Sequence, residues 1–216
     1  MATRGFRLIK PAVGLAALAP FVLLTARGIR GELGANPIEA ITHETGIWAL
    51  RFLLITLAVT PLRRVTGWSS LIGLRRTLGL FAFFYAALHF CTYLVLDQFF
   101  DVASIADDIA KRPYITAGFV ALVLLIPLAV TSTAAMIRRL GGKRWALLHR
   151  LVYVSAILAA VHFLWLVKAD VARPALYGMI LATLLGFRLW YTLAPSRASS
   201  GRGAGNAIPR IADGSR

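Results

Sequence analysis

The sequence contains few acidic residues and a single cysteine. Only 9 of its 216 residues are Asp or Glu, against 24 Lys or Arg, which gives a formal net charge of +15. Cys91 has no second cysteine to pair with, so no intramolecular disulfide can form, and its place inside an apolar run is explained by packing. Charged residues make up 15% of the chain and apolar residues 58%, which argues against an ordinary soluble domain.

Nucleotide-binding motifs are missing as well. No G-x-G-x-x-G pattern and no P-loop occurs in the chain. From Ser196 onward the sequence is rich in Gly, Ser and Arg without an apolar period, so we expect a disordered tail too short for a domain. We therefore expect no fused flavin or nucleotide domain of the Rossmann kind. If electrons pass through this protein, their source and their final acceptor lie mainly outside it.

Long apolar runs dominate what remains. Runs of roughly 20 residues alternate with short charged loops, the pattern of a polytopic membrane protein. The first run follows a basic head, as in a signal peptide, but lacks a convincing cleavage site, so we expect an uncleaved helix. We predict an all-α integral membrane protein, a six-helix transmembrane bundle. The six runs are residues 11–26, 47–62, 77–96, 114–136, 145–167 and 174–193.

The charges predict how the bundle is oriented. With the N-terminus in the cytoplasm, seventeen of the 24 basic residues fall on the cytoplasmic side, and all acids except Asp213 fall on the other. The positive-inside rule then predicts cytoplasmic termini and a multi-pass protein of the bacterial inner membrane. Because the basic residues flank apolar runs, attraction to membrane lipid explains them better than nucleic acid does. The expected parts are a cytoplasmic N-terminus (1–10), a transmembrane domain (11–193) and a disordered cytoplasmic tail (194–216).

Two histidines lie at matching depths in separate runs. His89 lies eight residues before Asp97, roughly 12 Å from that end of its helix. His162 lies six residues before Lys168, about 9 Å from the same side. A haem iron takes one axial nitrogen on each face of its ring, and facing helices can supply the two. We predict a b-type haem held by His89 and His162. The alternative is two separate buried histidines, each hydrogen-bonded to a helix carbonyl.

His149 is harder to interpret. It lies thirteen residues before His162, whereas two stacked haems would favour fourteen, and the residue fourteen before His89 is Arg75. A second haem thus lacks an obvious partner ligand. His149 could instead ligate weakly, hold a quinone or flavin ring, carry protons, or lie solvated at the membrane interface. We expect His43, just before the second run, to be exposed or interfacial.

Two loops suggest binding surfaces. Arg75, Arg76 and Arg144 belong to a cytoplasmic basic ring, which topology alone would explain, but which could also hold an anionic group such as a flavin phosphate. The segment 97–113 on the opposite side is acidic, and we predict a short interfacial helix there, capped by Ser104. That segment is either a docking surface for a soluble partner or a lid.

Several blocks of the sequence, taken in order, resemble those of one bacterial family. The chain is similar to the MsrQ (YedZ) family, haem-binding membrane subunits of the periplasmic protein-methionine-sulfoxide reductase system, within the ferric-reductase-like transmembrane superfamily. The resemblance covers nearly the whole chain except the tail. The blocks are GLRRTLGL (73–80), LHF (88–90), DIAKRPYITAG (108–118), PLAVTS (127–132), RLGGKRW (139–145), LHRLVY (148–153) and HF (162–163).

The resemblance implies a specific electron path. Electrons would pass from the quinone pool, or from a cytoplasmic flavin reductase, to a periplasmic molybdopterin-containing methionine sulfoxide reductase that repairs oxidised periplasmic proteins. It implies haem b, a bound FMN, and the family's histidines at His89, His149 and His162. Larger relatives carry a fourth histidine and a fused flavin domain, and the arginine at position 75 makes a second haem doubtful here. The alternatives are a stand-alone ferric or quinone reductase and a non-redox membrane transporter or scaffold.

Overall fold

The computed structural model describes residues 2–167 and 170–193, with side chains from residue 9 onward within those ranges. This part of the chain forms helices joined by turns and contains no strand. Six helical segments are long and apolar enough to cross a membrane, which confirms the predicted all-α bundle. The elements are α1 (Ala2–Ile29), α2 (Pro37–Thr66), the 3-10 turn η1 (Ser69–Gly73), α3 (Arg75–Thr92), the π-helical turn η2 (Tyr93–Asp97), α4 (Val102–Lys111), α5 (Pro113–Val130), α6 (Ala134–Leu140), α7 (Gly142–Leu148), α8 (Leu151–Leu166) and α9 (Ala172–Leu193).

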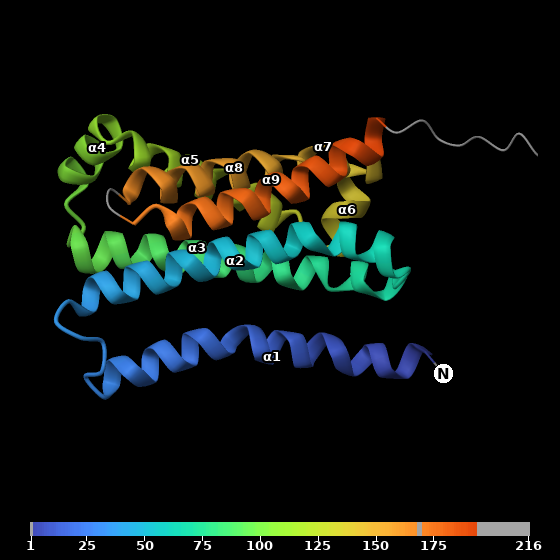
Figure 1. The fold of residues 1–216 in the computed structure, drawn as a ribbon, viewed down its shortest axis with the longest axis horizontal. Helices are drawn as coiled ribbons and strands as arrows, with labels where there is room; N and C mark the ends of the chain where they lie inside the picture. Colours follow the sequence, from blue (N-terminus) through green and yellow to red (C-terminus); the bar gives the residue numbers. More distant parts are fainter. Residues whose placement is uncertain (1, 168–169, 194–216) are drawn as a thin grey trace, which may run out of the picture.

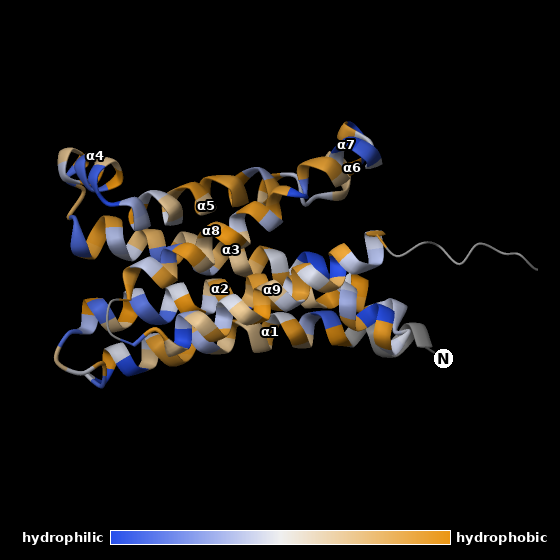
Figure 2. Cartoon of the chain, turned by 45° about the horizontal axis from the view of Figure 1, so that its top comes forward, coloured by the Kyte–Doolittle hydropathy of each residue, from blue (hydrophilic) through white to orange (hydrophobic). Residues whose placement is uncertain are grey.

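The bundle is built around two pairs of helices. The most extensive contacts join α2 to α3 and α5 to α8, and contacts of α3 with α5 and of α2 with α8 and α9 hold the pairs together. In Figure 1 the pair α2 and α3 lies between α1 on one side and α5, α8 and α9 on the other. Figure 2 shows hydrophilic residues gathered toward the two ends and hydrophobic residues along the length, as helices in lipid require.

One hydroxyl group ties α1 to the bundle. Tyr85 of α3 accepts a hydrogen bond from the Phe21 N–H (3.1 Å) and donates one to the Ala17 carbonyl (2.9 Å). A regular helix would join these two groups of α1 to each other, so the hydroxyl is inserted into the ladder beside Pro20. Because Tyr85 is almost fully buried, it fixes where α1 packs.

The second crossing begins ten residues earlier than predicted. Asn36 caps α2 by accepting a hydrogen bond from the Glu39 N–H (3.2 Å), Pro37 occupies the first turn, and Gly67 ends the helix at φ 73°. The prediction followed the apolar run alone, whereas the polar residues before it continue the same helix. His43 therefore lies inside α2 and not ahead of it, and its side chain is exposed as predicted.

The fourth crossing was predicted to extend to residue 136, but the helix there, α5, is shorter. The helix ends at Val130 and the backbone turns at Thr131 and Ser132, whose hydroxyls bond carbonyls four residues back, at 2.6 Å each. Thr133 then caps the separate helix α6 by accepting a hydrogen bond from the Met136 N–H (3.2 Å).

The fifth predicted crossing is interrupted. A turn at His149 and Arg150 separates α7 from α8, although the two together still form one membrane-length segment, Gly142–Leu166. The spacing argument between His149 and His162 assumed one regular helix and is therefore wrong in its geometry. His149 lies at the end of α7, with φ −68° and ψ −4°, and not within a continuous helix.

The helix predicted between the third and fourth crossings is present as α4, but its cap is a different residue. Asp101 accepts hydrogen bonds from the N–H groups of Ala103 (3.0 Å) and Ser104 (3.1 Å) and from the Ser104 hydroxyl (2.9 Å). Ser104, the predicted cap, lies inside the first turn. The carboxylate prevails because it satisfies two of the unpaired N–H groups at the helix start.

Charge separates the two ends of the bundle. We call the two ends the acidic end, which carries the described Asp and Glu residues, and the arginine end, which carries Arg63, Arg64, Arg75 and Arg188. The cytoplasmic placement of both termini stays a prediction, and residues 194–216, the predicted tail, lie outside the described ranges. The acids of the described ranges are Glu32, Glu39, Glu44, Asp97, Asp101, Asp107, Asp108 and Asp170.

Candidate functional site

A cavity of about 300 Å³ lies between the two helix pairs, toward the acidic end. Its walls come from α2, α3, α5 and α8 and are mostly apolar. His89 of α3 and His162 of α8 line it from opposite pairs. Ser155 also lines the cavity, but its buried hydroxyl is already satisfied by the Ala121 carbonyl (2.9 Å). His89 and His162 thus bring two imidazoles into the cavity from opposite helix pairs.

His89 is oriented by the facing helix α2. Its Nδ1 lies 2.8 Å from the Thr42 carbonyl, and a carbonyl can only accept, so Nδ1 carries the proton. One turn further along α2, Gly46 gives the ring room, because a Cβ there would lie 3.1 Å from Nδ1 and from Cε1. The glycine thus lets the imidazole lie against the backbone of α2.

His162 is held in the same way by α5. Its Nδ1 lies 2.6 Å from the Tyr114 carbonyl, so it also donates. Gly118, again four residues after the accepting carbonyl, supplies the room, since a Cβ there would lie 2.8 Å from Nδ1. The two helix pairs therefore repeat one device: a carbonyl, a glycine four residues later, and a histidine from the partner helix. We call each such unit a histidine clamp.

The two clamps bring the imidazoles together. The ring centroids of His89 and His162 lie 6.1 Å apart, with the ring planes at 70°. No hydrogen bond within the described ranges reaches Nε2 of either ring. Two imidazoles bound to opposite faces of one iron, with bonds of about 2 Å and about 1 Å more to each ring centre, would have centroids about 6 Å apart. The pair therefore fits a shared metal.

The rest of the cavity fits a haem better than a bare ion. Among the described residues no group of three His, Cys, Asp or Glu side chains comes close enough to hold a metal without further ligands. A porphyrin supplies four nitrogens of its own and needs only two axial ligands. Its apolar ring suits walls such as Leu50, Leu53, Phe119 and Leu125.

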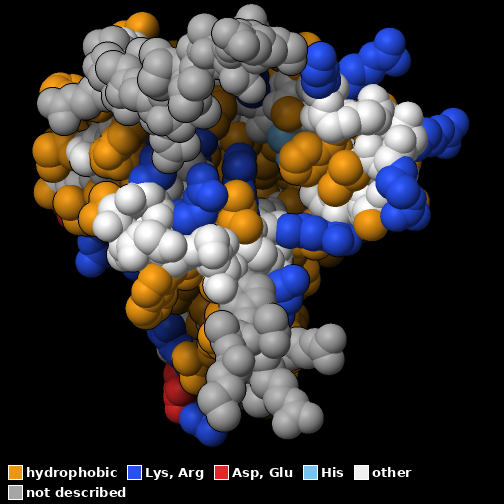
Figure 3. Space-filling view, turned by 90° about the vertical axis from the view of Figure 1, so that its right-hand side faces the viewer, with side chains coloured by type: hydrophobic (Ala, Val, Ile, Leu, Met, Phe, Trp, Pro, Cys, Tyr) orange, Lys and Arg blue, Asp and Glu red, His pale blue; other side chains and the backbone are white. Residues whose placement is uncertain are grey.

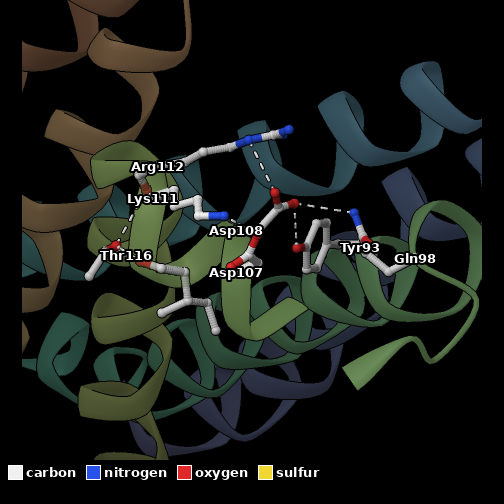
Figure 4. A network of polar contacts seen from close by, with 8 residues as sticks. Tyr93, Gln98, Asp107, Asp108, Lys111, Arg112 and Thr116 are labelled. Atoms are coloured by element: carbon white, nitrogen blue, oxygen red, sulfur yellow. Dashed lines mark hydrogen bonds and ion pairs between the residues drawn. The ribbon is translucent and has the colours of Figure 1, made fainter. Parts of the chain in front are cut away.

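A polar network joins α4 to η2 and to the residue before α5, beside the cavity (Figure 4). Asp108 of α4 accepts hydrogen bonds from the Tyr93 hydroxyl (3.0 Å) and the Gln98 amide (3.2 Å) and pairs with Arg112 (3.1 Å). Arg112 lines the cavity, and its pKa is raised by a hydrogen bond to the Tyr114 side chain and by the charge of Asp108, so it stays a cation. The Thr116 hydroxyl ties α5 back to the Ile109 carbonyl of α4. Because Ile109 and Arg112 line the cavity, α4 borders it, and we call this segment the α4 lid after one of its two predicted roles.

His149 lies outside this cavity, near the arginine end. Its Nε2 is 3.1 Å from the Thr131 hydroxyl, and its ring packs on Trp145 at 4.0 Å between centroids. The indole N–H of Trp145 also donates to the Thr131 carbonyl (3.0 Å). His149 therefore fastens the α7–α8 turn to the end of α5, and no second histidine faces it.

The three arginines considered for an anion are not assembled into one site. Arg75 is half-buried, within electrostatic reach of His149 and Arg188. Arg76 and Arg144 are exposed, on α3 and α7. The residues that sequence reasoning missed are the glycines of the clamps, Gly46 and Gly118. The signal that could have found them is the repeated four-residue offset, Thr42 to Gly46 and Tyr114 to Gly118.

Comparison with known proteins identifies the fold family. Residues 45–160 match the family model described as ferric reductase like transmembrane component. This range begins within α2 and ends within α8, so it includes part of each of the four helices that line the cavity, although Thr42 and His162 lie just outside it.

Individual relatives are similar over almost their whole length. The chain is 50% identical to a protein of Ralstonia nicotianae over 95% of both chains. It is 56% identical to one of Herminiimonas arsenicoxydans over 85% of both, and 54% identical to one of Rhodospirillum rubrum over 91% of this chain and 93% of the relative. Each of the three is named as a protein-methionine-sulfoxide reductase heme-binding subunit MsrQ.

Proposed function

The chain belongs to the MsrQ family, and from that membership we propose that it is the haem-binding electron-transfer subunit of a methionine sulfoxide reductase system. It is a multi-pass protein of the bacterial inner membrane with a redox role. The observation that carries the haem assignment is the pair of clamps, which occupy Nδ1 of His89 and of His162, leave each Nε2 without a hydrogen bond in the described ranges, and hold the ring centroids 6.1 Å apart.

In this proposal His89 and His162 are the axial ligands of a haem b. The haem, when bound, supplies one-electron chemistry by cycling between Fe(III) and Fe(II). The Thr42 and Tyr114 carbonyls fix the tautomer and direction of each ring and make Nε2 a better donor. The apolar walls exclude water, and Arg112 in the cavity lining favours an anionic edge of the cofactor.

The electron path follows from the orientation predicted by the charges. We place the arginine end and both termini in the cytoplasm, because positive residues near short loops remain inside. The transmembrane domain (11–193) then holds the haem near the periplasmic face. Electrons enter from the quinone pool or from a cytoplasmic flavin reductase and leave, near the α4 lid, to a periplasmic molybdopterin methionine sulfoxide reductase.

A bound FMN is the second cofactor of the proposal. Its support is the family resemblance together with the unpaired positive charge of the arginine end, where Arg75, Arg76 and Arg144 lie. His149 lies at that same end, and we assign it a positioning role beside this region. One haem is expected, since His89 and His162 are the cavity histidines held by clamps, whereas His43, which also lines the cavity, is exposed.

The haem assignment is tested with His89→Ala and His162→Ala. Each should abolish the reduced-minus-oxidised haem spectrum of purified membranes, because one axial ligand is lost. His43→Ala is the matched control, since His43 lines the same cavity but is exposed at its edge. A normal spectrum in both ligand variants would overturn the assignment. Methionine sulfoxide repair in the periplasm that survives deletion of the gene would overturn the partner assignment independently.

A further inference from the structure

A second, smaller cavity of about 220 Å³ lies at the arginine end, far from the histidine clamps. It is formed where α2, α8 and α9 meet. Five of its six lining residues carry a guanidinium or hydroxyl group, and both types donate hydrogen bonds to anionic oxygen. The lining residues are Thr60, Arg64, Tyr153, Phe187, Arg188 and Thr192.

Two hydrogen bonds fix the orientation of the Arg188 side chain in this cavity. Its guanidinium donates to the Leu57 carbonyl (2.9 Å) and to the Tyr153 hydroxyl, and it lies 5.0 Å from the Tyr153 ring centre. Its Nε is buried and has no hydrogen-bond partner in the described part of the chain, and the same is true of Arg63 Nε. Two guanidinium groups therefore keep unused donor capacity within the protein.

Nothing within the described ranges neutralises this charge. The ion pairs found there are both on α4, at the opposite end, and every described acid also lies at the acidic end. Arg64 is exposed and lies 4.6 Å from the Tyr191 ring centre, so it is positioned by an aromatic contact and not by a carboxylate. Figure 3, which looks onto this end, shows Lys and Arg side chains around a hollow. A half-buried cation without a counter-charge is costly, so an external anion would be stabilising.

We propose that this cavity binds a phosphate group. Paired arginines with nearby hydroxyls match the several oxygens of a phosphate, and Arg188 is already fixed in direction. The outer surface of α9 is apolar and exposed at Leu189 (60%) and Trp190 (72%), so the cavity opens beside the lipid, at headgroup level. The phosphate can therefore come from an acidic phospholipid or from a soluble phosphate ester. The proposal does not depend on the haem assignment; its FMN arm rests on the FMN proposed above, whereas its phospholipid arm does not.

The test uses the purified, haem-loaded full chain in neutral detergent and follows thermal unfolding by fluorescence. One arm adds phosphatidylglycerol, with phosphatidylcholine, whose phosphate is neutralised by its own choline cation, as the counterpart without net charge. The other adds FMN, with riboflavin as the same molecule without phosphate. We expect one charged probe to raise the unfolding temperature and its uncharged counterpart to have little effect. The arm that responds identifies the source of the phosphate.

Three variants decide whether the binding is local. Arg64→Gln should weaken the apparent affinity about tenfold, because one charge-assisted contact is lost. Arg188→Gln should weaken it at least as much, and if that variant fails to fold, Arg64→Gln decides alone. Arg139→Gln removes the same charge from an exposed position on α6, outside the cavity, and should bind like the parent protein. Equal weakening by Arg64→Gln and Arg139→Gln, unchanged binding by Arg64→Gln, or no response to either charged probe would overturn the proposal.

Discussion

At the acidic end, His89 and His162 donate through Nδ1 to backbone carbonyls, whereas near the arginine end His149 engages a threonine hydroxyl through Nε2. The first arrangement leaves Nε2, the nitrogen furthest from the backbone, directed away from its own helix pair. In the second arrangement, Nε2 of His149 is already hydrogen-bonded to Thr131. What separates a ligand-competent histidine from a structural one in this bundle is therefore which ring nitrogen the protein occupies.

The glycines of the two clamps offer the strongest way to break this arrangement. In Gly118→Ala the new Cβ would lie 2.8 Å from His162 Nδ1, and the ring cannot retreat without losing its bond to the Tyr114 carbonyl. Gly46→Ala is milder, because the corresponding distance to His89 is 3.1 Å. We expect at least a tenfold loss of haem affinity for Gly118→Ala and a several-fold loss for Gly46→Ala. The measurement is haem per protein after purification, with the midpoint potential of what remains.

Gly178→Ala is the control for these variants. It lies in α9 with nothing within 4 Å of the added Cβ, so the helix should gain stability, by about 1 kcal/mol or less, and haem content should not change. Equal haem content in the Gly118→Ala and Gly178→Ala proteins would contradict the clamp geometry. A larger loss for Gly46→Ala than for Gly118→Ala would reverse the ranking of the two clamps.

His149, near the arginine end, offers a second test of the difference between the histidines. His149→Ala removes the hydrogen bond to Thr131 and the packing on Trp145, and should destabilise the protein by about 1 to 3 kcal/mol. It should leave the haem spectrum intact, because His149 does not line the clamp cavity. Thr131→Val, which removes the partner of Nε2 but keeps the imidazole, should destabilise by a similar or smaller amount. A lost haem signal in His149→Ala would show that this end also holds a metal ligand.

The sequence predicted the six crossings and the histidine pair because both follow from linear quantities. Hydropathy counts residues in an apolar run, and depth counts residues from a helix end, so His89 and His162 could be matched without knowing any contact. The histidine clamps could not be predicted from such residue counts. Whether Gly46 faces His89 depends on which helices pack together. It also depends on the start of α2 at Pro37, which the apolar run alone did not predict because the first residues of this helix are polar.

Two of the errors involve hydrogen bonds that side chains make with the backbone. Hydropathy treats Thr131 and Ser132 as mildly polar residues of a long crossing, but their hydroxyls bond backbone carbonyls where α5 ends. In α4 both Asp101 and Ser104 are good capping residues, and only the folded geometry shows that the carboxylate takes the N–H groups. Such choices are decided by distances and not by residue type.

The smallest expected effect concerns the cap of the α4 lid. Hydrogen bonds from the Ser104 N–H and hydroxyl lower the pKa of the Asp101 carboxyl in the folded protein. A carboxyl with a lowered folded pKa stabilises the folded state fully above its unfolded pKa of about 4, and this contribution is lost as the pH falls through the folded value. The amide hydrogen-exchange protection of α4, corrected for intrinsic rates, should therefore fall as the pH is lowered below about 4. Asp101→Asn, which cannot titrate, should show weaker but pH-independent protection, and amides of α5 should be unchanged in both proteins. The same pH response in Asp101→Asn would mean that another group controls the lid.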